Sequence, residues 1–381
     1  MTLPLPGVGV FGTGLSAKAF IIMLRSAGFS IEALWGRTED EAAELAERMQ
    51  IPFFTNRIDE LLLHQRVDLV CINSPPFLHS QIAVKTLGIG KNVLCERPAG
   101  LGYSDTARMI NAARYYPSLM SLLGYNLRFL PTFQKMRRLI SERFLEDILV
   151  FEVRVHCGII FNENYSWSND ERMGGGMLAA FGSHFLDVLS FVSGQRATKV
   201  HGFLTTFQKK NSKINGFREI TSDDFCTFQM KMDKNAYCTC VLNNNIPGKF
   251  CYEVLAIGTE GRLSAKDGFL YGRKTSDADN KEVLLDEDAI ELPSEVDEFL
   301  PPEMKDQHPT PLLKGMLKFT EALRDSFCKF EDRRKWDHDI LQSASTFEDA
   351  LYVQTVLDSI RKSSKSCDWE QVPLYDSSNI S

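Results

Sequence analysis

The sequence predicts an α/β protein of two domains: a doubly wound parallel sheet, followed by an α+β domain built on an antiparallel sheet. At 381 residues with 44% hydrophobic content, the chain is long for one core and sufficient for two. Up to residue 124, short apolar runs alternate with helical patterns, which is typical of parallel strands joined by crossover helices. After residue 125, longer strand-like runs follow one another with only turns between them, as an antiparallel sheet requires.

The first half contains five apolar runs of strand length. Between the first three strands, the spacing of apolar residues predicts helices over Ser16 to Ala27 and Glu39 to Met49. Thr38 is expected to cap the second helix, whose first turn is acidic. The predicted strands are VGVFG (8–12), IEALWG (31–36), VDLVCI (67–72), NVLCE (92–96) and LMSLLG (119–124).

The second half combines four longer strands with three helices. The segment from Ser363 to Ser381 is polar and is expected to be a flexible tail. We therefore expect domains at 1–124 and 125–362, with a tail at 363–381. The predicted strands are Ile148 to Cys157, Phe225 to Met232, Ala236 to Leu242 and Tyr252 to Ile257, and the predicted helices are Gly175 to Val192, Pro311 to Phe327 and Leu341 to Lys362.

Charge and hydropathy argue against several classes of partner. The net charge is −7 and no long run of Lys or Arg occurs, so neither a nucleic acid nor an anionic membrane surface is expected to bind. Apolar runs such as Val67 to Ile72 have strand length, well below the roughly 20 residues of a membrane span. The apolar start from Met1 to Phe11 lacks a basic region, so it is interpreted as a buried strand and not as a secretory signal.

Cysteine usage favours a reduced, cytoplasmic protein. The nine cysteines form an odd set without a C-x-x-C pair. Cys238 and Cys240 share a face of a predicted strand, but a zinc site needs further ligands nearby that the sequence does not offer. We expect no metal site.

A glycine-rich motif follows the first strand directly and leads into a helix. It reads Gly12-Thr13-Gly14-Leu15-Ser16-Ala17, a G-x-G-x-x-A pattern. The first glycine permits a tight turn, the second allows the backbone to approach a pyrophosphate, and the small third residue lets helix and strand pack closely. The free N–H groups of the helix N-terminus then attract the phosphates. This context predicts a Rossmann domain that binds a nicotinamide dinucleotide.

The end of the second strand bears on the choice of cofactor. An NAD site usually has an acidic residue about 20 positions after the glycine motif, which binds the ribose hydroxyls. This sequence has no carboxylate there; instead Gly36 leaves room, and Arg37 with Thr38 can bind a 2′-phosphate. The pattern favours NADP over NAD. If Arg37 is a solvated loop residue or stacks on adenine, NAD remains open.

Taken together, several motifs resemble the Gfo/Idh/MocA oxidoreductases. The resemblance covers about Gly7 to Lys362 in order, and within the family it is strongest to the animal glucose-fructose oxidoreductase domain-containing proteins. The motifs are the glycine loop, Asn73-Ser74-Pro75-Pro76-Phe77-Leu78-His79, Cys95-Glu96-Arg97-Pro98, Asn126-Leu127-Arg128-Phe129-Leu130-Pro131, and Gly174-Gly175-Gly176-Met177-Leu178 leading to His184 and Asp187.

The resemblance implies a large, mostly antiparallel, open-faced sheet in the second domain, with helices on one face and the other face free for a homodimer or homotetramer contact. It implies that the helix around Leu341 to Lys362 returns to the Rossmann domain and that nicotinamide lies between the domains. It places Ser74, Pro75 and His79 beside the dinucleotide. It also places Glu96, Arg97 and Pro98 at the nicotinamide end.

Two positions depart from the family pattern. Active members usually carry Glu-Lys-Pro where this sequence has Glu96-Arg97-Pro98, and arginine cannot act as an acid or base at a working pH. The family aspartate four residues before the histidine is replaced by Ala180. His184 remains as a general base for an alcohol, with Arg97 supporting the developing alkoxide.

Three functions are therefore open. The first is hydride transfer between nicotinamide and a sugar, polyol or related small alcohol or carbonyl. The second is a catalytically degenerate cofactor-binding protein with a structural or regulatory role, and the third is a redox-neutral NAD-dependent glycosidase. Four residues are candidates for substrate contact, with the alternative that they only pack at the domain junction or interface: Asn126, Arg128, Tyr165 and Trp167.

Overall fold

The computed structural model describes residues 4–158, 165–210, 219–246, 250–279, 281–296 and 309–373. The chain forms two compact units, and each unit draws on more than one stretch of sequence. The first unit contains Met1–Phe129 and Glu291–Leu351, and the second contains Leu130–Ile290 and Tyr352–Asp376. The segment Glu291–Leu351, which the sequence analysis assigns to the second domain, thus clusters with the first unit.

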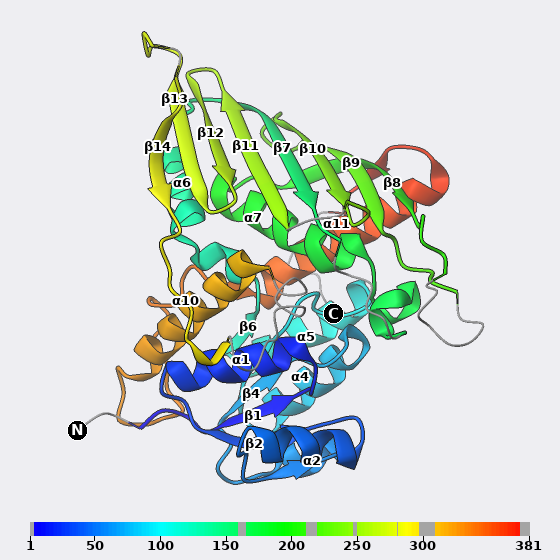
Figure 1. The fold of residues 1–381 in the computed structure, drawn as a ribbon, viewed down its shortest axis with the longest axis vertical. Helices are drawn as coiled ribbons and strands as arrows, with labels where there is room; N and C mark the ends of the chain where they lie inside the picture. The colour runs from blue at the N-terminus through cyan, green and yellow to red at the C-terminus, as the bar shows by residue number, and fades with distance from the viewer. Residues whose placement is uncertain are drawn as a thin grey trace. The chain divides into compact units, whose positions relative to one another are not determined.

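The first unit contains a seven-stranded sheet (Figure 1). Six strands are parallel and follow the order 3-2-1-4-5-6 of Rossmann sheets, and β15 pairs antiparallel with β6 at one edge. The order reverses between β1 and β4, so the topological switch point lies there. The strands are β1 Val8–Phe11, β2 Ile31–Trp35, β3 Phe54–Thr55, β4 Leu69–Ile72, β5 Asn92–Cys95, β6 Ser121–Leu123 and β15 Ser345–Thr346.

The central strands form because their side chains are apolar on both faces. All four residues of β1 are buried, as are those of β4 and β5, which is typical of a parallel sheet covered by helices. Thr38 caps α2, as predicted, by accepting the N–H of Glu41 at 3.2 Å. The helices of this unit are α1 Leu15–Ser26, α2 Glu39–Arg48, α3 Ile58–Leu62, α4 His79–Gly88, α5 Tyr103–Tyr115 and α10 Thr310–Phe327.

The second unit is built on a nine-stranded sheet in the order β14-β13-β12-β11-β7-β10-β9-β8-β16. All neighbours are antiparallel except β7 and β10, whose seven paired residues run parallel. The sheet is therefore large and mostly antiparallel, as the resemblance implies. The strands are β7 Ile148–His156, β8 Ala197–Thr205, β9 Phe225–Met232, β10 Tyr237–Asn243, β11 Cys251–Gly258, β12 Gly261–Lys266, β13 Phe269–Lys274, β14 Val283–Glu287 and β16 Glu370–Gln371.

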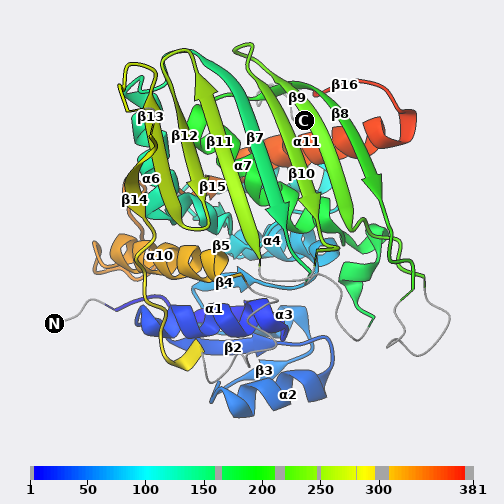
Figure 2. The ribbon, with the colours of Figure 1, turned by 45° about the horizontal axis from the view of Figure 1, so that its top comes forward.

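Helices pack on one face of this sheet (Figure 2). They are α6 Pro131–Ser141, α7 Ser183–Ser193 and the part of α11 Phe347–Ser366 that belongs to this unit. Alternate strand residues such as Phe151, Val153 and Val155 are buried under them. Side chains of the opposite face remain partly exposed, among them Phe203, Tyr237 and Phe269.

Two expectations need correction. The helical stretch Glu171–Ser193 has the length and apolar composition of a membrane span, so apolar runs are not limited to strand length. However, 89% of its most apolar 18 residues are buried inside the protein, as in a core helix. The predicted tail also begins too early. Ser363 lies inside α11, fully buried, and its hydroxyl accepts the N–H of Gly202 on β8 at 3.0 Å. Residues 374–381 lie outside the described part of the chain.

Candidate functional site

The carboxyl ends of β1, β4 and β5 meet at one edge of the first unit's sheet. Backbone hydrogen bonds continue past the strands there: Gly12 donates to Trp35 at 2.9 Å, Asn73 to Phe11 at 2.8 Å, and Glu96 to Ile72 at 2.8 Å. Three of the predicted cofactor segments are therefore adjacent at the switch point, where open α/β sheets bind their ligands.

Gly12 is the tight turn after β1. Its φ is +125°, and a Cβ built on it would lie 2.5 Å from the carbonyl oxygen of Asn73. A larger residue would both strain the backbone and push apart the loops after β1 and β4. Glycine at this position is required by the fold itself.

Gly14 differs from Gly12, because the fold does not require it. It is the N-cap of α1, with φ −71° and ψ 177°, values that any residue adopts. A Cβ built on it meets no heavy atom of the described residues within 4 Å. No side chain caps α1, so its first turn offers backbone N–H groups and the positive end of a 12-residue helix to an anion. An open space beside such a helix end fits a pyrophosphate.

The residues after β2 have local partners. A Cβ on Gly36 would come within 2.9 Å of Ala42, so the room at Gly36 is filled by the close approach of α2. Arg37 forms an ion pair at 2.6 Å with Glu41, one helical turn later, and 80% of its side chain is exposed. Arg37 is thus solvated and paired, and it lies at the end of the strand where a ribose would bind.

His79 connects two of the loops at this edge. Its Nε2 lies 2.6 Å from the carbonyl oxygen of Ser74, and its Nδ1 lies 2.9 Å from that of Pro98. The ring is buried, and burial lowers the pKa of His79. The side chain therefore fixes the relative position of the backbone at Ser74 and Pro98, and Pro75 lies in the loop that it holds.

Glu96 and Arg97 follow β5. Burial raises the pKa of the Glu96 carboxyl, while the neighbouring Arg97 opposes this rise; Glu96 Oε2 lies 3.8 Å from Arg97 Nε and accepts the Arg97 backbone N–H at 3.2 Å. The guanidinium side chain is only 19% exposed. The first unit thus places a fixed positive charge at the end of β5.

His184 belongs to the second unit, which is described by itself. It is the second residue of α7 and is 2% exposed. A π-helical turn, Leu178–Gly182, leads directly into α7 and contains Ala180. Turns of this kind are rare and often occur at functional sites. Asp187 is also buried on the same helix.

The four candidate substrate residues fall in two places. In the first unit, Asn126 and Arg128 are buried, and Arg128 Nη1 lies 3.2 Å from the carboxylate of Asp349 at the start of α11. This ion pair favours a structural role for Arg128. In the second unit, Tyr165 and Trp167 are half-buried, and Trp167 begins a short 3-10 turn.

Two residues escaped the sequence analysis. The Asn73 amide donates to the Ser16 hydroxyl at 3.4 Å and so joins the loop after β4 to α1; its position directly after a buried strand was the available clue. Asp223, which lies just before β9, accepts the N–H of Leu178 at 2.7 Å. Among the residues that the structure describes, no group of three His, Cys, Asp or Glu side chains is arranged to hold a metal.

Comparison with known families agrees with this arrangement. A model of the oxidoreductase family with an NAD-binding Rossmann fold matches residues 7–122, and the GFO/IDH/MocA C-terminal domain matches residues 133–264. The glucose-fructose oxidoreductase domain-containing protein 1 of Xenopus tropicalis is 49% identical over 97% of this chain and 93% of its own length. The chain belongs to the Gfo/Idh/MocA oxidoreductase family. The human glucose-fructose oxidoreductase domain-containing protein 2 is also 49% identical, over 97% of this chain and 94% of its own.

Solved structures of the Gfo/Idh/MocA fold resemble the whole chain. An oxidoreductase domain protein from Kribbella flavida superposes with a TM-score of 0.79 and 21% identity, covering 98% of this chain and all of its own. Levoglucosan dehydrogenase in complex with NADH and levoglucosan superposes with a TM-score of 0.78 and 18% identity, covering 97% of this chain and all of its own. At such identities the comparison establishes the fold.

Proposed function

We propose that this Gfo/Idh/MocA protein is a nicotinamide-dependent oxidoreductase that transfers a hydride between its cofactor and a sugar, polyol or related alcohol or carbonyl. The observation that carries the proposal is the open space at Gly14, beside the uncapped N-terminus of α1 and at the switch point of the sheet. A family likeness to NAD-binding oxidoreductases and the NADH held by levoglucosan dehydrogenase support it.

The first unit would hold the cofactor through backbone groups. The backbone N–H groups at the N-terminus of α1 would bind the pyrophosphate, while His79 keeps the loops at Ser74 and Pro98 in place. When bound, the nicotinamide supplies the hydride acceptor or donor. Arg97, charged at any working pH, would stabilise negative charge on a substrate oxygen but cannot relay a proton.

In the second unit, His184 is the proposed acid–base residue. Oxidation of an alcohol releases a proton, which an imidazole accepts near neutral pH. The Ala180 position has no carboxylate to assist, so the ring works without the family's usual partner. Tyr165 and Trp167 are proposed to contact the substrate.

The cofactor preference follows from the end of β2. The absence of a carboxylate at 35–37 and the presence of Arg37 support NADP, while the Glu41 carboxylate that pairs with Arg37 at 2.6 Å counts in favour of NAD. A 2′-phosphate would have to replace Glu41 as the partner of the guanidinium.

A second copy of the chain is proposed to cover the open face of the nine-stranded sheet. Tyr237 is 52% exposed and Phe203 53%, and both are large aromatic side chains, which are enriched in interfaces. Light scattering tests the proposal: we expect a dimer or tetramer, which Tyr237→Glu shifts toward a monomer. A monomeric wild-type protein would contradict it.

The experiment for the catalytic proposal is an alcohol screen with the bound cofactor. We expect reduced nicotinamide to accumulate with at least one polyol or sugar, and His184→Ala to lower the rate by at least about a hundredfold. His156, on β7, supplies a matched histidine control, and His156→Ala is expected to retain the rate.

The second candidate is a cofactor-binding protein whose catalysis has been lost. Arg97 in place of lysine and Ala180 in place of aspartate favour it. In that case the protein binds cofactor stoichiometrically but turns over no alcohol. The double variant Arg97→Lys, Ala180→Asp would then be needed to create activity.

A further inference from the structure

We propose that Asp223 is the positioning residue of the helix that carries His184. The proposal rests on the role assigned to His184 above, and it concerns contacts within the second unit alone. Asp223 lies just before β9, 45 positions away in sequence from the helix start that it contacts.

Asp223 contacts the helix start through both its backbone and its side chain. Its carbonyl oxygen accepts the N–H of Met177 at 2.8 Å, and its carboxylate Oδ2 accepts the N–H of Leu178 at 2.7 Å. These are N–H groups at the start of the π-helical turn, where a helix has no partners of its own. A charged acceptor at a helix N-terminus is also favoured by the helix dipole.

Gly176 explains how Asp223 approaches so closely. Its φ is +112°, and a Cβ built on it would collide with the Asp223 carboxylate. The last glycine of the Gly174–Gly176 run therefore makes room for this carboxylate. The glycines that mark this motif in the sequence and the aspartate 47 positions after Gly176 form one local structure.

The helix start is rigidly joined to His184. The turn Leu178–Gly182 continues without a break into α7, and the Ser183 hydroxyl donates to the carbonyl oxygen of Ala179 at 2.6 Å. His184 follows Leu178 by six residues, roughly 9 Å along a helix. Because α7 is buried along its length, a change at its first turn is transmitted to the histidine as a movement of the helix.

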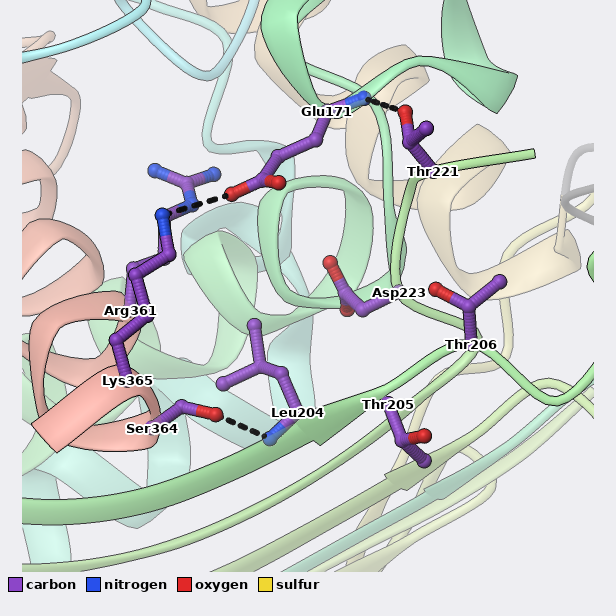
Figure 3. A pocket seen from close by; sticks show the side chains of 9 residues that line it. All are labelled: Glu171, Leu204, Thr205, Thr206, Thr221, Asp223, Arg361, Ser364 and Lys365. Atoms are coloured by element: carbon purple, nitrogen blue, oxygen red, sulfur yellow. Dashed lines mark hydrogen bonds and ion pairs between the residues drawn. The ribbon is translucent and has the colours of Figure 1, made fainter. Parts of the chain in front are cut away.

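Asp223 is buried, yet it forms part of the wall of a polar pocket of about 290 Å³ (Figure 3). The pocket gives a proton a path to the carboxyl. Its charges are two cations, Arg361 and Lys365, and two anions, Asp223 and Glu171, with Lys365 paired to Glu171 at 3.6 Å. The remaining lining residues are Leu204, Thr205, Thr206, Thr221 and Ser364.

The surroundings set the ionisation of this carboxyl. Burial raises the pKa of Asp223 to about 6, and Glu171 adds to the rise, while the Leu178 N–H and Arg361 oppose it. Two other titratable groups are close in sequence, Cys226 on the following strand and the adjacent Asp224. The Asp224 carboxylate is directed away from the helix start, because it accepts the N–H groups of Phe207 and Gln208. As the pH falls below neutral, the Asp223 carboxylate thus takes up a proton and loses its charge. Its hydrogen bond from the Leu178 N–H then weakens.

The test is a pH titration of the full-length His184→Gln protein by NMR, following the backbone amides of Leu178 and of position 184, so that titration of the histidine ring itself does not contribute. We expect both signals to shift with one common midpoint near pH 6. In Asp223→Asn, which keeps an acceptor oxygen but does not titrate, the step near pH 6 disappears from both signals.

Asp224→Asn is the matched control, because Asp224 is an equally buried neighbour that accepts N–H groups away from α7. It is expected to retain the common step. A Leu178 step that the amide at position 184 does not follow would overturn the proposal, and so would an unchanged step at position 184 when Asp223→Asn is added. If Asp223→Asn does not fold, the comparison of the two midpoints in the His184→Gln protein still decides.

Amide exchange gives an independent measurement. Asp223→Ala is expected to accelerate exchange over Leu178–His184 by about tenfold, the size of a lost helix cap. Neither experiment needs a substrate or turnover. An absence of hydride transfer would therefore reject the proposed function and leave the result for Asp223 intact.

Discussion

His79 Nδ1 lies 2.9 Å from the carbonyl oxygen of Pro98, and the other ring nitrogen lies 2.6 Å from that of Ser74. A neutral imidazole carries one N–H and donates to one carbonyl at a time. Since burial lowers the pKa of His79, the neutral ring is favoured at pH 7. One side chain thus joins the loops that follow β4 and β5.

We predict that His79→Ala destabilises the protein by about 2 kcal/mol, because a buried hydrogen bond is lost and a cavity is left. It should also weaken cofactor binding, since both loops belong to the cofactor edge. Urea unfolding and cofactor titration measure the two effects. The exposed His338 is the control, with an expected change within about 0.5 kcal/mol for His338→Ala. Unchanged stability of His79→Ala would contradict this interpretation.

The stability of the protein should depend on Asp223 between pH 4 and 6. Its pKa is about 6 in the folded protein and 3.8 as the ordinary value, so the folded state binds the extra proton in this range. Protonation of Asp223 therefore adds up to about 3 kcal/mol to the free energy of unfolding. This contribution is complete below pH 3.8 and is lost as pH rises through 6. Urea unfolding of wild type and Asp223→Asn across this range measures it. The stability of wild type relative to the variant must fall as pH rises; a constant difference would refute the assignment.

Arg37 provides the test of cofactor preference. If the guanidinium binds a 2′-phosphate, Arg37→Ala should weaken NADPH binding by about tenfold and leave NADH binding unchanged. Glu41→Gln should instead strengthen NADPH binding, because it releases Arg37 from its ion pair. Fluorescence titrations with both cofactors measure the four affinities. Equal responses of NADH and NADPH to Arg37→Ala would show that Arg37 does not select the cofactor.

The central parallel strands could be predicted from sequence because they are continuously apolar. Val8–Phe11, Leu69–Ile72 and Asn92–Cys95 are buried on both faces, and this composition identifies them. Strands β8, β12 and β13 inside the second sheet were not predicted, and two strands at sheet edges were missed for a physical reason. Phe54–Thr55 has only two residues, and Val283–Glu287 is exposed along most of its length, so neither shows a burial pattern.

The candidate site was predictable where its residues follow a strand directly. Gly12, Asn73 and Glu96 each stand at the end of a buried strand, and the parallel topology then brings them to one edge. Asp223 could not be found this way, because its partner Leu178 lies 45 positions earlier and no local pattern links them. The pairing of β15 with β6 likewise depends on tertiary packing between distant segments.

The most direct test of the cofactor site is a titration of the wild-type protein, Gly14→Ala and Gly12→Ala with NADH and NADPH. The Cβ of Gly14→Ala enters open space, so the variant should fold with stability within about 0.5 kcal/mol of wild type and yet bind cofactor at least about tenfold more weakly. Gly12→Ala should instead lose about 2 kcal/mol or more of stability through its positive φ. Tight binding of one cofactor by wild type, lost in a stable Gly14→Ala protein, is the predicted result; no binding by wild type, or full binding by Gly14→Ala, would contradict the account.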